Sequence, residues 1–141
     1  MTAHLLEVNN LTKHFPLNTD PISRMLGRSL TLKAVDGVSF AIKPGETVGL
    51  VGESGCGKST TGRLVTRLIE PTDGEVKLKG EDLLAFGSDR KKEMRKSIQL
   101  VFQDPYASLN PRKTIMQTLG RPLEVHELAS SWHEQREQVL E

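Results

Sequence analysis

The 141-residue chain has few of the features that mark secreted or membrane-spanning proteins. It contains one cysteine, Cys56, which excludes an internal disulfide and favours a reducing compartment. No apolar run approaches the roughly 20 residues that a membrane-spanning helix needs, and residues 1–5 lack the basic start and apolar centre of a signal peptide. The 19 basic and 18 acidic residues nearly cancel, at a net charge of +1, so nucleic acid and anionic membranes are not expected partners. We therefore expect a cytoplasmic protein of one domain at most.

A glycine-rich run is the most informative part of the chain. Residues 52–59, GESGCGKS, fit the phosphate-binding pattern G-x-x-x-x-G-K-S/T. Glycines let the backbone N–H groups of such a loop turn inward around phosphates. Lys58 is expected to reach the β- and γ-phosphates of a nucleotide, and the Ser59 hydroxyl to help hold Mg²⁺. The residues expected to contact the nucleotide are Gly52, Glu53, Ser54, Gly55, Cys56, Gly57, Lys58, Ser59 and Thr60. A glycine-rich turn without a ligand is the alternative.

The flanks of this loop have the pattern that a phosphate-binding loop requires, a strand before it and a helix after it. Residues 47–51 are a short apolar run, which predicts a strand buried on both faces, as in parallel sheets. Apolar residues recur at helical spacing over 59–69, which predicts a helix that Pro71 and the following turn end. The glycine loop therefore lies between a predicted strand and a predicted helix.

Other strands are predicted on both sides of this unit. Apolar and polar residues alternate around Leu6 and Val8 and again from Val38 to Ile42, so an antiparallel β layer is expected before the α/β core. Residues 16–32 between them read as a loop. A further strand is predicted around Val76, and residues 98–102, IQLVF, predict an apolar strand that ends at Gln103.

Two capping boxes predict helices near the end of the chain. Thr114 with Gln117 opens a short helix that Pro122 is expected to limit. Ser131 with Glu134 opens a second helix, whose Trp132 is expected to pack in a core. The apolar stripe of that helix has just begun at residue 141, which favours an interrupted domain.

The β layer, the glycine loop and the strand ending in Gln103 together resemble the nucleotide-binding domain of ABC transporters. In that family an aromatic residue of the N-terminal strand region stacks on adenine, and Phe15 stands at the matching place; a core aromatic is the alternative for it. Residues 98–111 resemble the family's Q-loop, whose glutamine, here Gln103, reaches toward Mg²⁺ and the attacking water. The resemblance thus implies ATP and Mg²⁺ as cofactors, with Gln103 as the catalytic residue and Ser59 and Gln103 at the metal.

The sequences of three stretches are similar to those of one branch of that family, the ATPase subunits of bacterial dipeptide and oligopeptide importers. These stretches are KAVDGVSF (33–40), VGESGCGKST (51–60) and QDPYASLNP (103–111). The resemblance implies membrane permease subunits and a second ATP-binding subunit, in a homo- or heterodimer, as partners. It places the protein in the cytoplasm, peripheral on the inner face of the cell membrane, and coupled to peptide uptake.

The expected fold is an α/β P-loop NTPase core of an ABC nucleotide-binding domain, with an N-terminal antiparallel β layer and truncated at the start of the helical subdomain. Its parts are a β layer at about 1–45, the P-loop core to the Q-loop at 46–105, and the start of the helical subdomain at 106–141. The family's signature sequence, Walker B strand, catalytic glutamate and switch histidine are absent. We therefore expect nucleotide binding without appreciable turnover. The alternatives are another P-loop enzyme, such as a small-molecule kinase, and a non-catalytic nucleotide-binding fragment that docks on a permease.

Overall fold

A computed structural model describes residues 4–17, 30–85, 87–104 and 109–140 of the chain. The chain separates into two compact units, Met1–Leu100 and Val101–Glu141. Most of the loop predicted over 16–32 lies outside the described residues. Among those that are described, no helix has the length and apolar character to cross a bilayer.

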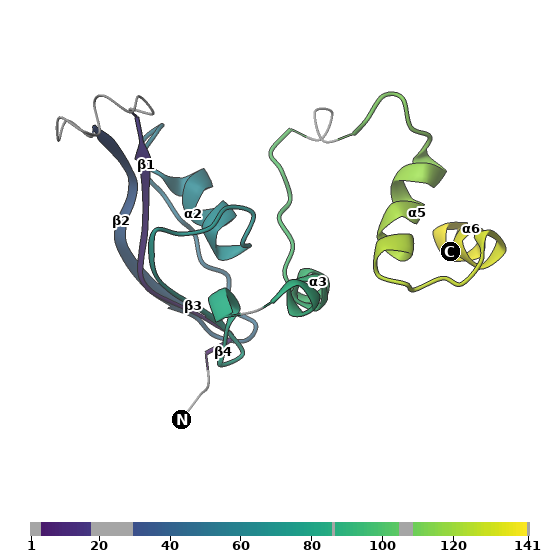
Figure 1. Ribbon diagram of the computed structural model, residues 1–141, viewed down its shortest axis with the longest axis horizontal. Helices are drawn as coiled ribbons and strands as arrows, with labels where there is room; N and C mark the ends of the chain where they lie inside the picture. The colour runs from purple at the N-terminus through teal and green to yellow at the C-terminus, as the bar shows by residue number, and fades with distance from the viewer. Residues whose placement is uncertain (1–3, 18–29, 86, 105–108, 141) are drawn as a thin grey trace. The chain divides into compact units, whose positions relative to one another are not determined.

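The first unit contains an antiparallel sheet in the order β2-β1-β3-β4 (Figure 1). β1 (Leu6–Pro16) is its central long strand, since β2 (Thr31–Ile42) pairs along one side and β3 (Asp73–Leu78) along the other. β4 (Glu81–Asp82) adds a short edge. The predicted N-terminal antiparallel layer is confirmed.

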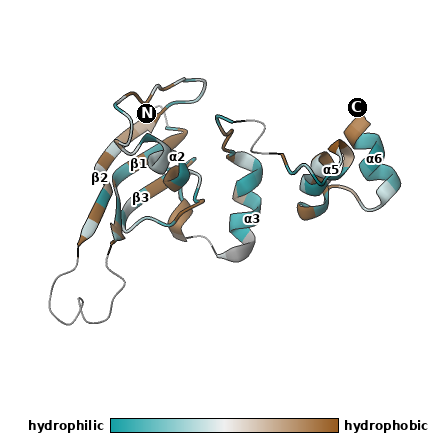
Figure 2. Ribbon diagram, turned by 90° about the horizontal axis from the view of Figure 1, so that it is seen from above, coloured by the Kyte–Doolittle hydropathy of each residue, from teal (hydrophilic) through white to brown (hydrophobic). Residues whose placement is uncertain are grey.

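Alternating side chains bury one face of this sheet. Leu6 and Val8 of β1, two residues apart, are almost fully buried, as is Leu11 beyond an irregularity in the strand pairing. The alternation along β2 is visible as successive brown and teal segments in Figure 2. α2 (Lys58–Val65) packs on this face through Leu64 and Val65. The core of the unit consists of Leu6, Val8, Leu11, Val35, Leu64, Val65, Val76, Leu83 and Met94.

The helix after the glycine loop is shorter than predicted. α2 ends at Val65, and Arg67 has a left-handed backbone with φ of 54°. A residue in that conformation cannot continue a right-handed helix. Leu68, which lies within the helix predicted over 59–69, is consequently outside α2 and 51% exposed.

The predictions of apolar strands on either side of the helix after the glycine loop are wrong. Residues 47–51 and 98–102 belong to no strand, and Val51 and Val101 are 90% and 92% exposed. A strand requires a neighbour that accepts and donates its backbone hydrogen bonds. Within the described residues, no strand pairs with either run, so apolar β-favouring composition alone does not form the ladder.

The rest of the first unit runs through η1 (Leu83–Ala85), a 3₁₀ turn, into α3 (Ser88–Ser97). α3 is hydrophilic over nearly its whole length (Figure 2). It contributes Met94 to the core, so it is a solvated helix held at one apolar point.

The second unit is a pair of helices, α5 (Ile115–Val125) and α6 (Trp132–Leu140). The capping box of α5 is confirmed, because Thr114 Oγ1 accepts from the Gln117 N–H and the Gln117 side chain accepts from the Thr114 N–H. Pro122 lies inside α5, so the prediction that it limits the helix is wrong. Proline removes one backbone donor, but the last turn is still held by the His126 N–H donating to the Pro122 carbonyl at 3.0 Å.

The two helices meet at Gly120, which is buried. The Gln135 side chain of α6 donates to the Gly120 carbonyl at 2.6 Å. Trp132, by contrast, is 67% exposed and lies near the Arg136 guanidinium, so the prediction that it packs in a core is wrong. None of the described α6 residues is buried. A pair of short helices buries only a small fraction of its surface, so it does not enclose a side chain as large as that of Trp132.

Candidate nucleotide-binding site

The predicted phosphate loop leads directly into α2, with Gly57 as the residue that caps the helix. Gly57 has φ of 97°, a conformation in which a Cβ is strained. A Cβ added there would also lie 2.3 Å from the carbonyl oxygen of Ala34 in β2. Glycine at this position therefore lets the end of the loop rest directly on the backbone of the sheet.

The first turn of α2 presents free backbone donors to the loop. Its first intrahelical bond is from the Thr61 N–H to the Gly57 carbonyl, at 2.8 Å, which leaves the N–H groups of Lys58, Ser59 and Thr60 without an intrahelical acceptor. No side chain caps this helix start. Unpaired donors and the positive end of the helix together favour an anion such as a phosphate.

Lys58 closes the loop from within. Its ammonium donates to the carbonyls of Gly52 at 2.7 Å and Glu53 at 2.6 Å, and lies 3.5 Å from the Cys56 sulfur. The side chain thus curls back over residues 52–56 instead of extending into solvent. This arrangement holds the positive charge inside the loop, where a phosphate would be contacted.

The remaining predicted loop residues lie at the surface. Glu53, Ser54, Gly55, Cys56 and Ser59 are exposed, and Thr60 is half-buried. Cys56 is a free thiol, and a Cβ added at Gly52 would lie 2.6 Å from its sulfur. The thiol therefore covers the start of the loop.

Phe15 lies in β1, near the end of the strand that pairs with the start of β2. Its partner across the ladder is Leu32, two residues from the Ala34 carbonyl that approaches Gly57. The ring is half-buried and outside the core cluster. The structure therefore brings Phe15 to the part of β2 on which the phosphate loop rests.

One residue beside Phe15 was missed from the sequence. The Lys13 ammonium lies over the Phe15 ring, 5.2 Å from its centre. Residues two apart on a strand share a face, so the spacing of Lys13 and Phe15 was the available signal.

The end of the sheet near Phe15 also carries a charged cluster. His14 Nε2 lies 2.8 Å from Asp36 Oδ1, and Lys33 donates to the other Asp36 oxygen at 3.1 Å. The hydrogen bonds from His14 and then Lys33 lower the pKa of Asp36 below its ordinary value of 3.8. This carboxylate is consequently ionised at neutral pH, and the Lys33 ammonium balances its charge.

Gln103, the predicted catalytic and metal residue, is exposed and belongs to the second unit. Ser59 belongs to the first unit. Within the described ranges, no group of three or more His, Cys, Asp or Glu side chains could hold a metal ion. The exposed Ser59 hydroxyl suits Mg²⁺, which takes few protein ligands and is held largely by phosphates and water.

Comparison with known proteins agrees with this geometry. The family described as ABC transporter matches residues 35–141. The oligopeptide transport ATP-binding protein AppF of Bacillus subtilis (strain 168) is 46% identical over 97% of this chain and 41% of its own length. The dipeptide transport ATP-binding protein DppF of Escherichia coli (strain K12) is 45% identical over 96% of this chain and 39% of its own. The chain thus spans about two fifths of the curated relatives that it matches.

Solved structures give the same result. The dimeric post-hydrolysis state of the ATP-binding cassette MJ0796, bound to ADP and Pi, has a TM-score of 0.72 and 26% identity. The match covers 96% of this chain and 54% of that one. The chain belongs to the ABC transporter family.

Proposed function

We propose that this chain forms the nucleotide-binding part of an ATP-binding subunit of an ABC importer for peptides. The observation that carries the proposal is the Lys58 ammonium, held inside a loop whose last glycine rests on β2 and whose helix start has no side-chain cap. The names of relatives that are 45–46% identical, oligopeptide and dipeptide transport ATP-binding proteins, support the same function.

The phosphates of ATP bind in this proposal at residues 52–60. The first N–H groups of α2 donate to phosphate oxygens, and Lys58 exchanges a carbonyl partner for the β- and γ-phosphates. A phosphate oxygen is the better acceptor, because its negative charge adds Coulomb attraction to the hydrogen bond from the ammonium. Cys56 contributes its backbone to the loop.

Adenine stacks on Phe15. The Phe15 ring lies outside the core cluster, and its strand pairs with β2, which Gly57 approaches. This position supports stacking on adenine over the alternative of core packing. Aromatic rings stack on nucleobases without needing a hydrogen-bond pattern. The base would thus contact β1, and the phosphates a loop that rests on β2, the strand paired with β1.

In this proposal the Ser59 hydroxyl would hold Mg²⁺, and Gln103 of the Q-loop would be a second protein ligand. When bound, the ion neutralises charge on the β- and γ-phosphates. Gln103 is the chain's candidate for orienting the attacking water. The family's catalytic glutamate is absent from this sequence, so we expect the 141-residue chain to bind nucleotide without appreciable turnover. Steady ATP hydrolysis by the purified chain, abolished by Lys58→Ala, would contradict this.

The proposed partners are membrane permease subunits and a second ATP-binding subunit, on the inner face of the cell membrane. The dimeric form of the similar cassette MJ0796 supports a paired arrangement. Binding of ATP and its hydrolysis in the pair would then be coupled to peptide uptake through the permease.

The test is a calorimetric titration of Mg²⁺-ATP into the 141-residue chain and two lysine variants. Removing a charged hydrogen-bond donor costs about 1.5–3 kcal/mol, so we expect Lys58→Ala to raise the Kd about 10- to 150-fold. Lys43→Ala is the matched control, since Lys43 is an exposed lysine in the turn before the loop. Equal Kd values for all three proteins would refute binding at this loop.

A further inference from the structure

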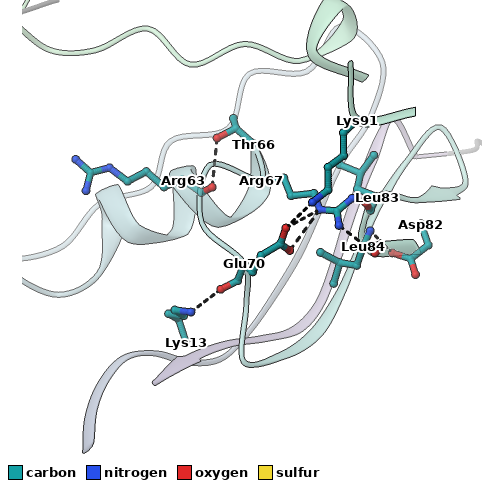
Figure 3. Close-up of polar contacts among 9 residues, drawn as sticks. All are labelled: Lys13, Arg63, Thr66, Arg67, Glu70, Asp82, Leu83, Leu84 and Lys91. Atoms are coloured by element: carbon teal, nitrogen blue, oxygen red, sulfur yellow. Dashed lines mark hydrogen bonds and ion pairs between the residues drawn. The ribbon is translucent and has the colours of Figure 1, made fainter. Parts of the chain in front are cut away.

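Lys13 links the Phe15 ring to the main chain at Glu70, which is distant in the sequence. Besides lying over the ring, its ammonium donates to the main-chain carbonyl of Glu70 at 2.6 Å (Figure 3). Glu70 follows the end of α2, 57 residues further along the chain. One ammonium therefore contacts both the candidate base platform and the connection from α2 to β3.

The Glu70 end of this link is held in place by several contacts. Its carboxylate accepts from Lys91 of α3 at 2.9 Å and lies 3.4 Å from the Arg67 side chain. The Arg67 side chain is only 7% exposed and donates to the carbonyls of Leu83 and Leu84 in η1, as Figure 3 shows. Because Glu70 is tied to α3 and Arg67 to η1, the carbonyl that receives Lys13 is a firm anchor.

We propose that Lys13 is a positioning residue that sets which face of Phe15 receives the base. The inference rests on the proposed function, and it adds to it how the base platform is oriented. With the ammonium over one face, the base stacks on the opposite face. A ring held in this way has less rotamer freedom to lose when the base binds, which favours affinity.

Lys13 thus acts on the base-dependent part of affinity and leaves the phosphate-dependent part to Lys58. The strength of the contact between an ammonium and an aromatic ring limits the gain in ATP affinity from this ordering. At a partly exposed site the limit is a factor of about two to five in the Kd. Phosphate binding at residues 52–60 requires no contact with Lys13. The two contributions can therefore be separated by comparing ATP with inorganic tripolyphosphate, which has no base.

The experiment measures the Kd of Mg²⁺-ATP and Mg²⁺-tripolyphosphate for wild type, Lys13→Met and Lys96→Met. Methionine keeps an unbranched side chain and removes the ammonium. We expect Lys13→Met to weaken ATP about two- to fivefold while tripolyphosphate is unchanged. Lys96→Met is the matched control, since it removes a lysine paired with a carboxylate of its own helix, Glu93, that has no part in the Glu70 anchor; we expect neither Kd to change.

A double substitution tests whether Lys13 acts through the ring. In a Phe15→Leu background, we expect Lys13→Met to have no further effect on the Kd of ATP. Lys13→Arg keeps a cation that can cover the ring and donate to Glu70, and should keep the wild-type ratio of the two Kd values. This variant keeps the inference falsifiable if Lys13→Met does not fold.

The outcomes separate this inference from the proposed function. Wild type binding neither ligand would overturn the proposed function. If wild type binds both, an unchanged ratio of Kd values in Lys13→Met would overturn the role of Lys13. Parallel weakening of both ligands would assign Lys13 a merely structural role, and loss of tripolyphosphate alone would assign it a phosphate contact. If the ratio of the ATP and tripolyphosphate Kd values in Lys13→Arg differed from that of wild type, positioning of the ring by the charge would also be refuted.

Discussion

Alanine at Gly57 combines two costs that the structure separates. The first is conformational, since φ of 97° lies in the region that side chains rarely adopt, at a cost of about 1–2 kcal/mol. The second is steric, because the new Cβ would lie 2.3 Å from the Ala34 carbonyl oxygen. That contact is with backbone and not with a flexible side chain, so the loop or β2 must move. Overpacking of this kind costs about 1–3 kcal/mol.

The sum is about 2–5 kcal/mol, a large fraction of the 5–15 kcal/mol by which domains are typically stable. Gly55→Ala is the internal control. Gly55 also has a positive φ, 82°, but a Cβ there would meet nothing within 4 Å. It therefore carries the conformational cost alone, about 1–2 kcal/mol.

The assay is urea unfolding of wild type and both variants, with ATP binding measured on the folded proteins. We expect the unfolding midpoint to fall for both and to be lowest for Gly57→Ala. Displacement of the loop should also weaken ATP binding by Gly57→Ala beyond the effect of Gly55→Ala. Indistinguishable midpoints for the two variants would refute the close approach of Gly57 to β2.

Three further predictions concern the loop, the anchor of Lys13 and the second unit. Full alkylation of Cys56, the single cysteine, should block ATP binding because the adduct fills the mouth of the loop; unchanged calorimetric binding would count against its placement there. The hydrogen bond from Lys91, followed by the charge of Arg67, holds the pKa of Glu70 below its ordinary value of 4.5. Its stabilising contribution is thus present above pH 4.5 and is lost as the pH falls through the lower folded pKa. Glu70→Gln should accordingly cost about 0.2–1 kcal/mol in urea unfolding at pH 7 and less at pH 3, whereas an equal cost at both would contradict the ion pair. Thr114→Ala should cost about 0.5–2 kcal/mol of α5 stability, and unchanged helicity by circular dichroism would argue against the capping box with Gln117.

The sequence was sufficient where the decisive interactions are local. The capping box at Thr114 and Gln117 needs partners three residues apart, and the alternation around Leu6 and Val8 repeats every second residue. The glycine loop was likewise recognisable because its φ angles and donors lie within eight consecutive residues. Each of these features was found in the structure at the expected place.

Prediction failed where a structure depends on a partner from elsewhere in the chain. Residues 47–51 and 98–102 have β-favouring composition, but strand formation depends on a neighbouring ladder that local composition does not supply. The end of α2 depends on the backbone of Arg67, whose side chain is buried against the carbonyls of η1. Helix propensity favours arginine, so the local sequence did not predict the left-handed conformation of Arg67 that ends the helix.

The sheet joins the two halves of the candidate site through β2. The carbonyl of Ala34 supports Gly57 of the phosphate loop, and Leu32, two residues earlier, pairs with Phe15. A change that shifts β2 should therefore weaken phosphate and base contacts together. A change at Lys13 reaches the ring from Glu70 and bypasses β2, so it should alter the base contact alone. The ratio of the ATP and tripolyphosphate affinities consequently distinguishes a displaced strand from a displaced ring, even where the two cause the same loss of ATP affinity.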